Sequence, residues 1–583
     1  MRFRALICST LVFSLSLVAQ QVKTAPAPAS EIPHLRKQGT ATQLIVDGKP
    51  MLLLAHELSN TGATSVAYMK PAWPKIVDAK LNSVLAGVSW NQIEPQEGKF
   101  DFTVLDGIIR DARAYNQRLV LLWFASWKNG QSSNLPDWVK RDYERFPRVQ
   151  IVGATWPVFG GGSGQPRALF SGSIELLSPL GDASRDADAR AFAALMRHVK
   201  AVDGQQHTVI MIQVENEVGI QGDTRDRSPV ANKAFDGPVP KELMDYLQQH
   251  KDNLIPVLRK VWEGTGFKTS GTWEEVFGKG RPTEEIFMAW HFARYIGRVV
   301  DAGKAEYPIP MFTNCPQSGI GREPAPVKGG QSGGPMPDVF DVWRAGAPRI
   351  DIFGVDVYGF DFAMMTERFT QSGNPLLIPE TVGGLEGAAR ALYAFGRYDS
   401  ISFSPMNGGI DRRLTPDYEL IAGYDILTQL TPLILGHQGK GTMTAVMLQP
   451  KDAPQKIKLG NYTLQVAFVA PRAGTRGAPP PEPPTLAGAL FIQTGPDEYF
   501  VAGFGVSISF SPNTPGLPLA GLATVEEGAF VNGRWVPGRQ LAGDDTIEGD
   551  CLELKWPPRG VPPAPLPRMR TENIQRVTLY RYR

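Results

Sequence analysis

Short apolar runs recur between amphipathic stretches from residue 41 to about residue 435. The runs are mostly apolar and not strictly alternating, which is typical of parallel strands buried on both faces. They lie at residues 51–56, 83–90, 118–124, 208–215, 310–314, 350–358, 375–380 and 400–405. The stretches between them carry apolar residues at steps of three and four, the period of a helix. Strands alternating with helices in this number predict an α/β fold, a (β/α)₈ TIM barrel, over residues 41–435.

An open, doubly wound sheet is the alternative fold. No G-x-G-x-x-G sequence follows the first apolar run, which argues against a dinucleotide-binding sheet. The segment between the fourth and fifth runs contains helical stretches near residues 241–262 and 284–300. We therefore expect a large insertion at the functional rim of the barrel.

The pattern changes after Gly436. Polar and apolar residues now alternate between Gly/Pro turns, as at residues 462–471, 488–510 and 575–583. This pattern predicts an antiparallel β-sandwich over residues 436–583. We expect the sandwich to pack on the barrel and to shape the cleft or an oligomer contact. An independent carbohydrate-binding module is the alternative.

The N-terminus has the pattern of an export signal. Arg2 and Arg4 precede an apolar run at residues 5–18, which is shorter than the roughly 20 apolar residues that span a bilayer. Residues 1–20 are therefore predicted to be a signal peptide, with a retained anchor as the alternative. Residues 21–40 are polar and rich in Pro and Ala, which predicts a disordered leader. These features predict a periplasmic or secreted protein with no membrane span after signal removal.

Composition narrows the possible partners. Lys+Arg is 60 against Asp+Glu 58, and the net charge of +2 argues against a nucleic-acid partner. Cys8 lies in the signal region, and Cys315 and Cys551 are expected to be buried free thiols. The cysteines and histidines show no spacing typical of metal ligands, so neither a metal nor an organic cofactor is implied.

Two carboxylates stand at the ends of predicted strands. The fourth run leads into Asn216 and Glu217, and the seventh ends at Glu380. Active sites of such barrels lie at the C-terminal ends of the strands, so both carboxylates belong to one rim. Retaining glycoside hydrolysis needs this pair, one to protonate the leaving oxygen and one to attack the anomeric carbon. The acid should have a raised pKa while the nucleophile stays ionised.

Further candidates for contact with substrate lie at the ends of other predicted strands. Tyr358 ends the sixth run, where its hydroxyl could bond Glu380, and Asn314 ends the fifth. Tryptophan faces can pack on sugar C–H surfaces, with core packing as the alternative; the candidates are Trp90, Trp123 and Trp127.

Three acidic or basic residues have structural alternatives. Glu215 either contacts sugar or belongs to a buried structural pair, because strand alternation points it away from Asn216. Glu94 is interpreted as a structural residue that binds loop amides, and His56 as a packed histidine.

Several strings resemble glycoside hydrolase family 35, the β-galactosidases of clan A. They are QVENEVG (213–219), VSWNQIEPQEGKFDF (88–102) and SWKNGQSSNLPDWV (126–139). The resemblance covers residues 41–435 and is closest to a bacterial branch with a C-terminal β-sandwich, some members of which act in xyloglucan breakdown. It implies that Glu217 is the acid/base, Glu380 the nucleophile and Asn216 the residue that bonds the sugar 2-hydroxyl. Trp90 and Asn91 stand at familiar positions of the second string and are expected to bind substrate, as is Trp127 in the third.

One position departs from the family. Many members have an acidic residue where Ser126 stands, and that residue helps to hold galactose. Sugar specificity stays open at this point, and Glu57, at the end of the first strand, could supply a substitute carboxylate.

The sequence thus predicts an exported retaining exo-glycosidase. The first hypothesis is a β-galactosidase that releases terminal β-galactose from oligosaccharides such as xyloglucan-type cell-wall fragments. The insertion after Glu217 favours exo action because it would block one side of the cleft. Another clan A activity, an endo-glycanase or an arabinosidase, is the second hypothesis, and a non-catalytic sugar-binding protein is the third. The oligomeric state stays open, a homo-oligomer included.

Overall fold

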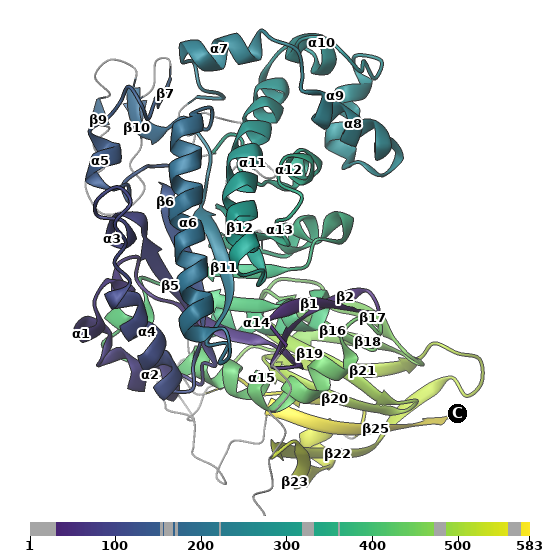
Figure 1. Cartoon of the computed structure of the whole chain (residues 1–583). Coiled ribbons are helices and arrows are strands. Elements are labelled where there is room, and N and C mark those ends of the chain that lie inside the picture. The colour runs from purple at the N-terminus through teal and green to yellow at the C-terminus, as the bar shows by residue number, and fades with distance from the viewer. Residues whose placement is uncertain are drawn as a thin grey trace, which may run out of the picture.

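Eight parallel strands close into a barrel (Figure 1). Their order around the barrel is β4 (Leu53–Glu57), β5 (Ser83–Ser89), β6 (Arg118–Lys128), β11 (Val209–Asn216), β12 (Met311–Pro316), β13 (Ile352–Val357), β14 (Leu377–Thr381) and β15 (Ser402–Pro405). The predicted TIM barrel is therefore confirmed, and each strand overlaps one of the apolar runs.

The computed structural model describes part of the 583-residue chain. The described residues are 31–151, 155–156, 167–168, 173–220, 223–316, 331–359, 362–471, 485–547, 549–557 and 573–583. The predicted signal peptide, Cys8 and residues 21–30 of the predicted leader lie outside these residues. Among the described residues, none of the helices combines the length and the apolarity needed to cross a bilayer.

Helices surround the barrel and carry the insertion. The longer ones are α2 (Ala72–Asp78), α4 (Thr103–Ala114), α6 (Asp182–Asp203), α11 (Arg281–Glu306), α12 (Phe340–Gly346), α13 (Phe362–Phe369), α14 (Gly384–Tyr398) and α15 (Tyr418–His437). Short helices are α1 (Val66–Met69), α3 (Trp90–Ile93) and α5 (Asp137–Lys140). The expected insertion follows β11 as α7 (Pro229–Phe235), α8 (Lys241–Gln249), α9 (Pro256–Glu263) and α10 (Trp273–Phe277), at the top of Figure 1.

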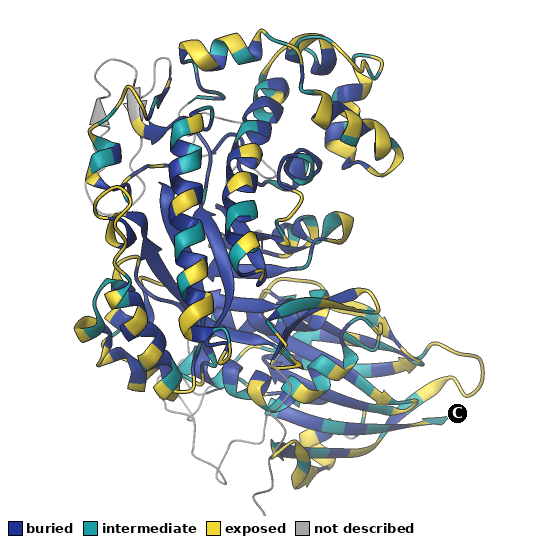
Figure 2. Cartoon of the chain, viewed as in Figure 1, coloured by how far each residue is buried: buried dark blue, intermediate teal, exposed yellow. Residues whose placement is uncertain are grey.

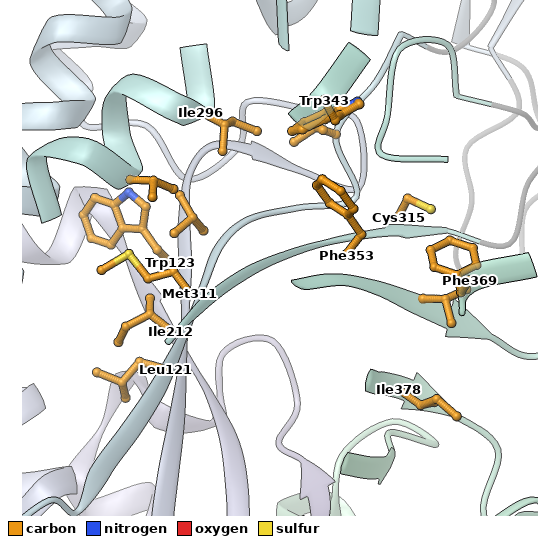
Figure 3. Close-up of a cluster of buried hydrophobic side chains, with 14 of the residues drawn as sticks. Leu121, Trp123, Ile212, Ile296, Met311, Cys315, Trp343, Phe353, Phe369 and Ile378 are labelled. Atoms are coloured by element: carbon orange, nitrogen blue, oxygen red, sulfur yellow. The ribbon is translucent and has the colours of Figure 1, made fainter. Parts of the chain in front are cut away.

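Two apolar layers hold the barrel together. Leu53, Leu85 and Val120 belong to a cluster that fills the barrel interior, as is usual for this fold. A second cluster lies between strands and helices, where Trp123 of β6 and Phe353 of β13 belong to it (Figure 3). The strands are accordingly buried almost throughout, and exposed residues concentrate on the outer faces of the helices (Figure 2).

Residues expected to be disordered form an ordered strand. β1 (His34–Gln38) pairs with β2 (Ala41–Val46), which pairs with β3 (Lys49–Met51). Gln38 Nε2 donates to the carbonyls of Leu435 at 2.9 Å and Gln438 at 3.0 Å. The prediction of a disordered leader is therefore wrong for residues 34–38, because strand pairing and these contacts with the end of α15 fix them.

The C-terminal region is a β-sandwich, as predicted. One sheet has the order β16 (Met443–Leu448), β19 (Ala487–Gly495), β20 (Glu498–Phe504), β25 (Ile574–Tyr582), β22 (Leu519–Val531) and β23 (Arg534–Leu541). The other has the order β17 (Gln455–Leu459), β18 (Tyr462–Phe468), β21 (Val506–Pro512) and β24 (Leu552–Leu554). One apolar cluster contains residues of both sheets, including Val446, Leu464 and Val501.

The sandwich packs on the barrel through α14 and α15. Gly396 of α14 lies so close to Leu490 of β19 that an added Cβ would come within 2.9 Å of its side chain. Gln429 of α15 accepts a hydrogen bond from the backbone N–H of Phe530 at 3.0 Å. The expected packing of the sandwich on the barrel is confirmed.

The remaining short elements lie in the loops. Small strand pairs are β7 (Arg148–Gln150) with β10 (Ser173–Leu177) and β8 (Thr155–Trp156) with β9 (Arg167–Ala168). Turns of 3₁₀ helix lie at Gly62–Thr64, Lys251–Asn253, Pro337–Val339, Gln371–Gly373, Ile410–Arg412 and Gly543–Thr546.

Candidate active site

Four carboxylates and one lysine meet where the barrel strands end. We call Glu57, Glu217, Asp356 and Glu380 the carboxylate cluster. Glu57 ends β4, Glu217 follows β11, and Asp356 and Glu380 stand near the ends of β13 and β14. The charges of all four act on the ammonium of Lys128, the last residue of β6. The structure thus brings the two predicted catalytic carboxylates to one rim, as expected.

Glu380 is held from two sides. The Tyr358 hydroxyl donates to Glu380 Oε2 at 2.7 Å, and Lys128 Nζ lies 3.8 Å from Glu380 Oε1. Strict alternation would send Glu380 outward with Ile378, which packs in the outer cluster. The register of β14 against β15 shifts between Ile378 and Thr381, and this irregularity allows Glu380 to face the cluster. The predicted contact between Tyr358 and Glu380 is confirmed.

A strained turn presents Glu217. Glu215 and Glu217 have φ values of 61° and 47°, in the left-handed region that side chains with a Cβ rarely adopt. The backbone N–H of Glu217 donates to Asn314 Oδ1 at 2.9 Å, and Asn314 Nδ2 donates to Asp356 Oδ2 at 2.6 Å. Asn314 therefore positions the backbone of Glu217 and links it to Asp356. Such strain is retained where the surrounding structure over-determines the backbone, as at many active sites.

Glu217 holds its proton near neutral pH. Burial, and then the charge of Glu380, raise the pKa of Glu217 to about 7, against the opposing effects of Lys128 and of a hydrogen bond with Asp356. An acid that is protonated near neutrality is suited to donate a proton to a leaving group.

Glu57 and Asp356 extend the carboxylate cluster beyond Glu217 and Glu380. Burial and the charge of Glu380 raise the pKa of each well above the ordinary carboxyl range. Among the described residues, no donor reaches either oxygen of Glu57 or Oδ1 of Asp356. Buried polar oxygens generally have a hydrogen-bond partner, and a substrate-binding role for Glu57 stays a prediction.

The Asn216 amide is fixed in orientation. Its Oδ1 accepts from Lys128 Nζ and from Gln213 Nε2, both at 3.1 Å. Its Nδ2 donates to Asn129 Oδ1 at 3.1 Å. One Nδ2 hydrogen therefore remains for another acceptor, as a contact with a sugar hydroxyl requires.

Two predicted sugar platforms are core residues instead. Trp90 is fully buried and donates to Glu94 Oε2 at 2.8 Å, and Glu94 also accepts from the Gly98 N–H at 2.7 Å. Trp127 is fully buried and donates to the Leu177 carbonyl at 3.1 Å. The substrate-binding role predicted for Trp90 and Trp127 is therefore wrong, because their rings are enclosed and their N–H groups are already bonded. The structural role of Glu94 is confirmed.

Trp123 and His56 are packed residues as well. Trp123 is fully buried and donates to Asp188 Oδ1 at 2.9 Å. His56 lies beside the Glu57 carbonyl, with 2.8 Å between Nδ1 and that oxygen. Burial lowers the pKa of His56 to about 4, so the ring is neutral near pH 7.

Ser126 faces away from the carboxylate cluster. Its hydroxyl donates to Asp188 Oδ2 at 2.6 Å and contacts the Tyr295 hydroxyl at 2.8 Å. Glu215 accepts from the N–H groups of Ser126 and Trp127, and burial, followed by the charge of Asp188, raises the pKa of Glu215. Glu215 thus belongs to a buried structural pair. Ser126 therefore does not contribute to the carboxylate cluster, whereas Glu57, at the end of β4, does.

Asn91 lies outside the carboxylate cluster. Its side chain is exposed on α3 and lines a cavity of about 270 Å³ beside Val88, Asp101 and Leu105. The structure does not bring it together with Glu217 or Glu380, and a contact with substrate stays a prediction.

Sequence reasoning missed Lys128 and Asp356. Asp356 is an acid inside an otherwise apolar strand, and that signal was available. The apolar run that marks β6 ends at Phe124, but the strand continues through a bulge to Lys128. Lys128 therefore lies outside the part of the strand that the sequence pattern predicts. Among the described residues, no group of His, Cys, Asp or Glu has the arrangement of a metal site, and Cys315 and Cys551 are free thiols, the first buried and the second half-buried.

Two family models match parts of this chain. Residues 68–157 match the family model described as "Beta-galactosidase" of the Glyco_hydro_42 type, and residues 420–552 match a domain of unknown function, DUF5597. The first match covers β5 and β6 but neither Glu217 nor Glu380.

One curated relative and several solved structures are similar to part of this chain. A β-galactosidase of Xanthomonas manihotis is 28% identical over 225 residues, which is 36% of this chain and 30% of that protein. A β-galactosidase structure from Bacillus circulans has 17% identity and a TM-score of 0.43, covering 66% of this chain and 57% of its own. A β-amylase catalytic domain from Paenibacillus polymyxa has 10% identity and a TM-score of 0.42, covering 64% of this chain and 96% of its own.

The carboxylate cluster thus lies in a barrel whose strands β5 and β6 match a β-galactosidase family model. The sequence similarity is to β-galactosidases, and this chain spans less than a third of the curated relative's length.

Proposed function

We propose that the protein is a retaining exo-β-galactosidase of the family 35 type. The observation that carries the proposal is the pairing of unlike carboxyls on one rim. Glu217 has a pKa of about 7, and Glu380 is held by the Tyr358 hydroxyl and lies beside the Lys128 ammonium. Acid and nucleophile in these two states are what the first step of retaining hydrolysis needs.

The reaction proceeds by two displacements. The Glu217 carboxyl gives its proton to the glycosidic oxygen while a Glu380 oxygen bonds to the anomeric carbon, and the aglycone leaves as an alcohol. The Glu217 carboxylate then takes a proton from water, whose oxygen attacks the same carbon and displaces Glu380. Two inversions at one carbon retain the β-configuration of the sugar.

The choice of galactose rests on sequence similarity. The strings around Glu217, Trp90 and Trp127 resemble family 35, and the curated relative is named a β-galactosidase. The substrates proposed are oligosaccharides with terminal β-galactose, such as xyloglucan-type cell-wall fragments. The signal peptide predicted at residues 1–20 supports the proposal of a periplasmic or secreted location.

A panel of nitrophenyl glycosides tests the proposal. The purified protein should hydrolyse the β-galactoside faster than the β-glucoside, the α-arabinoside or the β-fucoside. Glu380→Gln, which is close in shape, should abolish that hydrolysis while its circular dichroism stays that of the wild type. Preference for the arabinoside would favour the second hypothesis, and no hydrolysis of any member would contradict a glycosidase.

A further inference from the structure

Lys128 reaches the site because of an irregular strand. Between the pairs Val214–Trp123 and Asn216–Lys128, the register of β6 against β11 shifts. A bulge of this kind re-aims side chains at the rim of a barrel. Its result here is a lysine whose side chain is 8% exposed, placed beside the residues that follow β11.

The Lys128 ammonium contacts both halves of the proposed machinery. It donates to Asn216 Oδ1 at 3.1 Å and lies 3.8 Å from Glu380 Oε1. It also lies 4.6 Å from the centre of the Phe124 ring. The charged groups that face it are Glu57 from β4, Glu217 after β11, Asp356 from β13 and Glu380 from β14.

A buried ammonium is stable only when it is paired. Burial alone lowers the pKa of Lys128, but the acidic groups around it, Glu380 first, outweigh burial and raise the pKa above the ordinary lysine value. The side chain is therefore charged wherever the enzyme would work. In turn, its charge favours the ionised form of the carboxylates around it, and it opposes the rise in the pKa of Glu217.

We propose that Lys128 is a positioning residue of this site, a role that rests on the proposed function. It orients the Asn216 amide by occupying Oδ1 together with Gln213, so that an Nδ2 hydrogen faces the sugar. Its ammonium also lies 3.8 Å from Glu380 Oε1 and provides a positive charge beside that carboxyl group. Lys128 acts through Asn216 and Glu380 and does not itself need to touch the substrate.

The contact with Asn216 predicts a dependence on one sugar hydroxyl. Hydrogen bonds to the 2-hydroxyl strengthen in the transition state of glycoside hydrolysis. Lys128→Met removes the charge and keeps much of the side-chain volume, so it should lower kcat more than it changes KM. The loss should be about tenfold or more on a β-galactoside and smaller on the matched 2-deoxy-β-galactoside. Equal losses on the two substrates would overturn the role through Asn216.

The contact with the carboxylates predicts a shift in pH dependence. An opposite charge nearby lowers a carboxyl pKa by roughly one unit or more. In the pH profile of kcat/KM, Lys128→Met should therefore move the basic limb to higher pH by about one unit. Lys128→Arg, which keeps the charge, should return the limb toward the wild-type position. Lys304→Met is the matched control, because Lys304 pairs with Asp351 at 2.5 Å outside the cluster. An unmoved limb in Lys128→Met would overturn the electrostatic role.

A measurement without substrate separates this proposal from the proposed function. Without Lys128, the carboxylate cluster loses a buried cation, and ionisation of the carboxyls becomes more costly. The melting temperature of Lys128→Met should therefore fall below that of Lys304→Met, and the gap should widen between pH 5 and pH 8. A constant gap would contradict the charge role. If the wild type hydrolysed no glycoside but the gap widened, the function would fail while the electrostatic role of Lys128 stood.

Discussion

The Tyr358 hydroxyl donates a hydrogen bond to Glu380 Oε2 at 2.7 Å, from the end of the strand that neighbours Glu380. Burial and the charge of Glu380 raise the pKa of Tyr358 well above its ordinary value, so the hydroxyl stays a donor at alkaline pH. The phenol thus fixes one oxygen of the proposed nucleophile and leaves the other beside Lys128.

Tyr358→Phe should slow hydrolysis without unfolding the protein. Hydrogen bonds to charged groups contribute about 1.5–3 kcal/mol, so kcat/KM on a nitrophenyl β-galactoside should fall by roughly 10- to 100-fold. The residue as a whole is 42% exposed although its hydroxyl group is buried against Glu380, so the melting temperature should change little. Steady-state kinetics and thermal melting of the same preparation check this. Undiminished kcat/KM would show that the hydrogen bond does not orient the nucleophile.

The rate should fall above neutral pH as Glu217 loses its proton. Because the pKa of Glu217 is raised to about 7, kcat/KM for a poor leaving group should show a basic limb near that pH. Methyl β-galactoside is a suitable substrate, since its alkoxide cannot leave without a proton. In Glu217→Gln this limb should disappear together with most of the activity. A limb that persists in the residual activity of Glu217→Gln would assign it to another group.

Glu217 should also make folding stability depend on pH. Its pKa is raised from 4.5 to about 7 in the fold, so its stabilising contribution is full below pH 4.5 and is lost as the pH rises through 7. Glutamine cannot ionise, and the melting temperature of Glu217→Gln relative to the wild type should therefore rise between pH 5 and pH 8.

The exposed Glu97 provides a control of opposite sign. A hydrogen bond with Arg145 lowers the pKa of Glu97, so Glu97→Gln should show no such relative rise. A flat difference between Glu217→Gln and the wild type over the same pH range would contradict the raised pKa of Glu217.

Glu217→Ala and Glu380→Ala should fail in different ways. Loss of a general acid costs about 10²–10⁴-fold, but a dinitrophenolate leaves without a proton. Glu217→Ala should therefore give a burst of dinitrophenolate followed by a slow steady rate, and azide should accelerate the slow phase. Glu380→Ala should show neither the burst nor the acceleration. If Glu217→Ala lost activity equally on good and poor leaving groups, with no azide effect, Glu217 would not be the acid/base.

The barrel could be predicted because the pattern of an apolar run followed by an amphipathic stretch is repeated along the chain. Each apolar run marks one buried strand, and the rule that active sites lie at strand ends selects Glu217 and Glu380 without any structure. Tyr358 and Asn314 follow from the same rule, and the structure places both beside the catalytic pair.

The errors fall where local geometry breaks the regular pattern. The alternation of inward and outward side chains does not predict where a strand bulges. The bulge near the end of β6 is therefore the reason why Lys128 was not predicted as a site residue. Trp90 and Trp127 are of the residue type that packs on sugars, but only tertiary packing decides whether an indole ring faces a cleft or the core. The segment His34–Gln38 is polar, so its sequence predicts disorder. Its order comes from pairing with β2 across a short turn and from contacts with α15, which is distant in sequence.

Trapping the covalent intermediate tests the central claim most directly. A 2-deoxy-2-fluoro-β-galactoside with a dinitrophenolate leaving group should form the glycosyl-enzyme quickly and release it slowly, because the fluorine destabilises both transition states. Peptide mass spectrometry of the trapped wild type should place a single fluorogalactosyl group on Glu380. A label on Glu57 or on any other residue, or turnover with inversion and no label, would contradict the account.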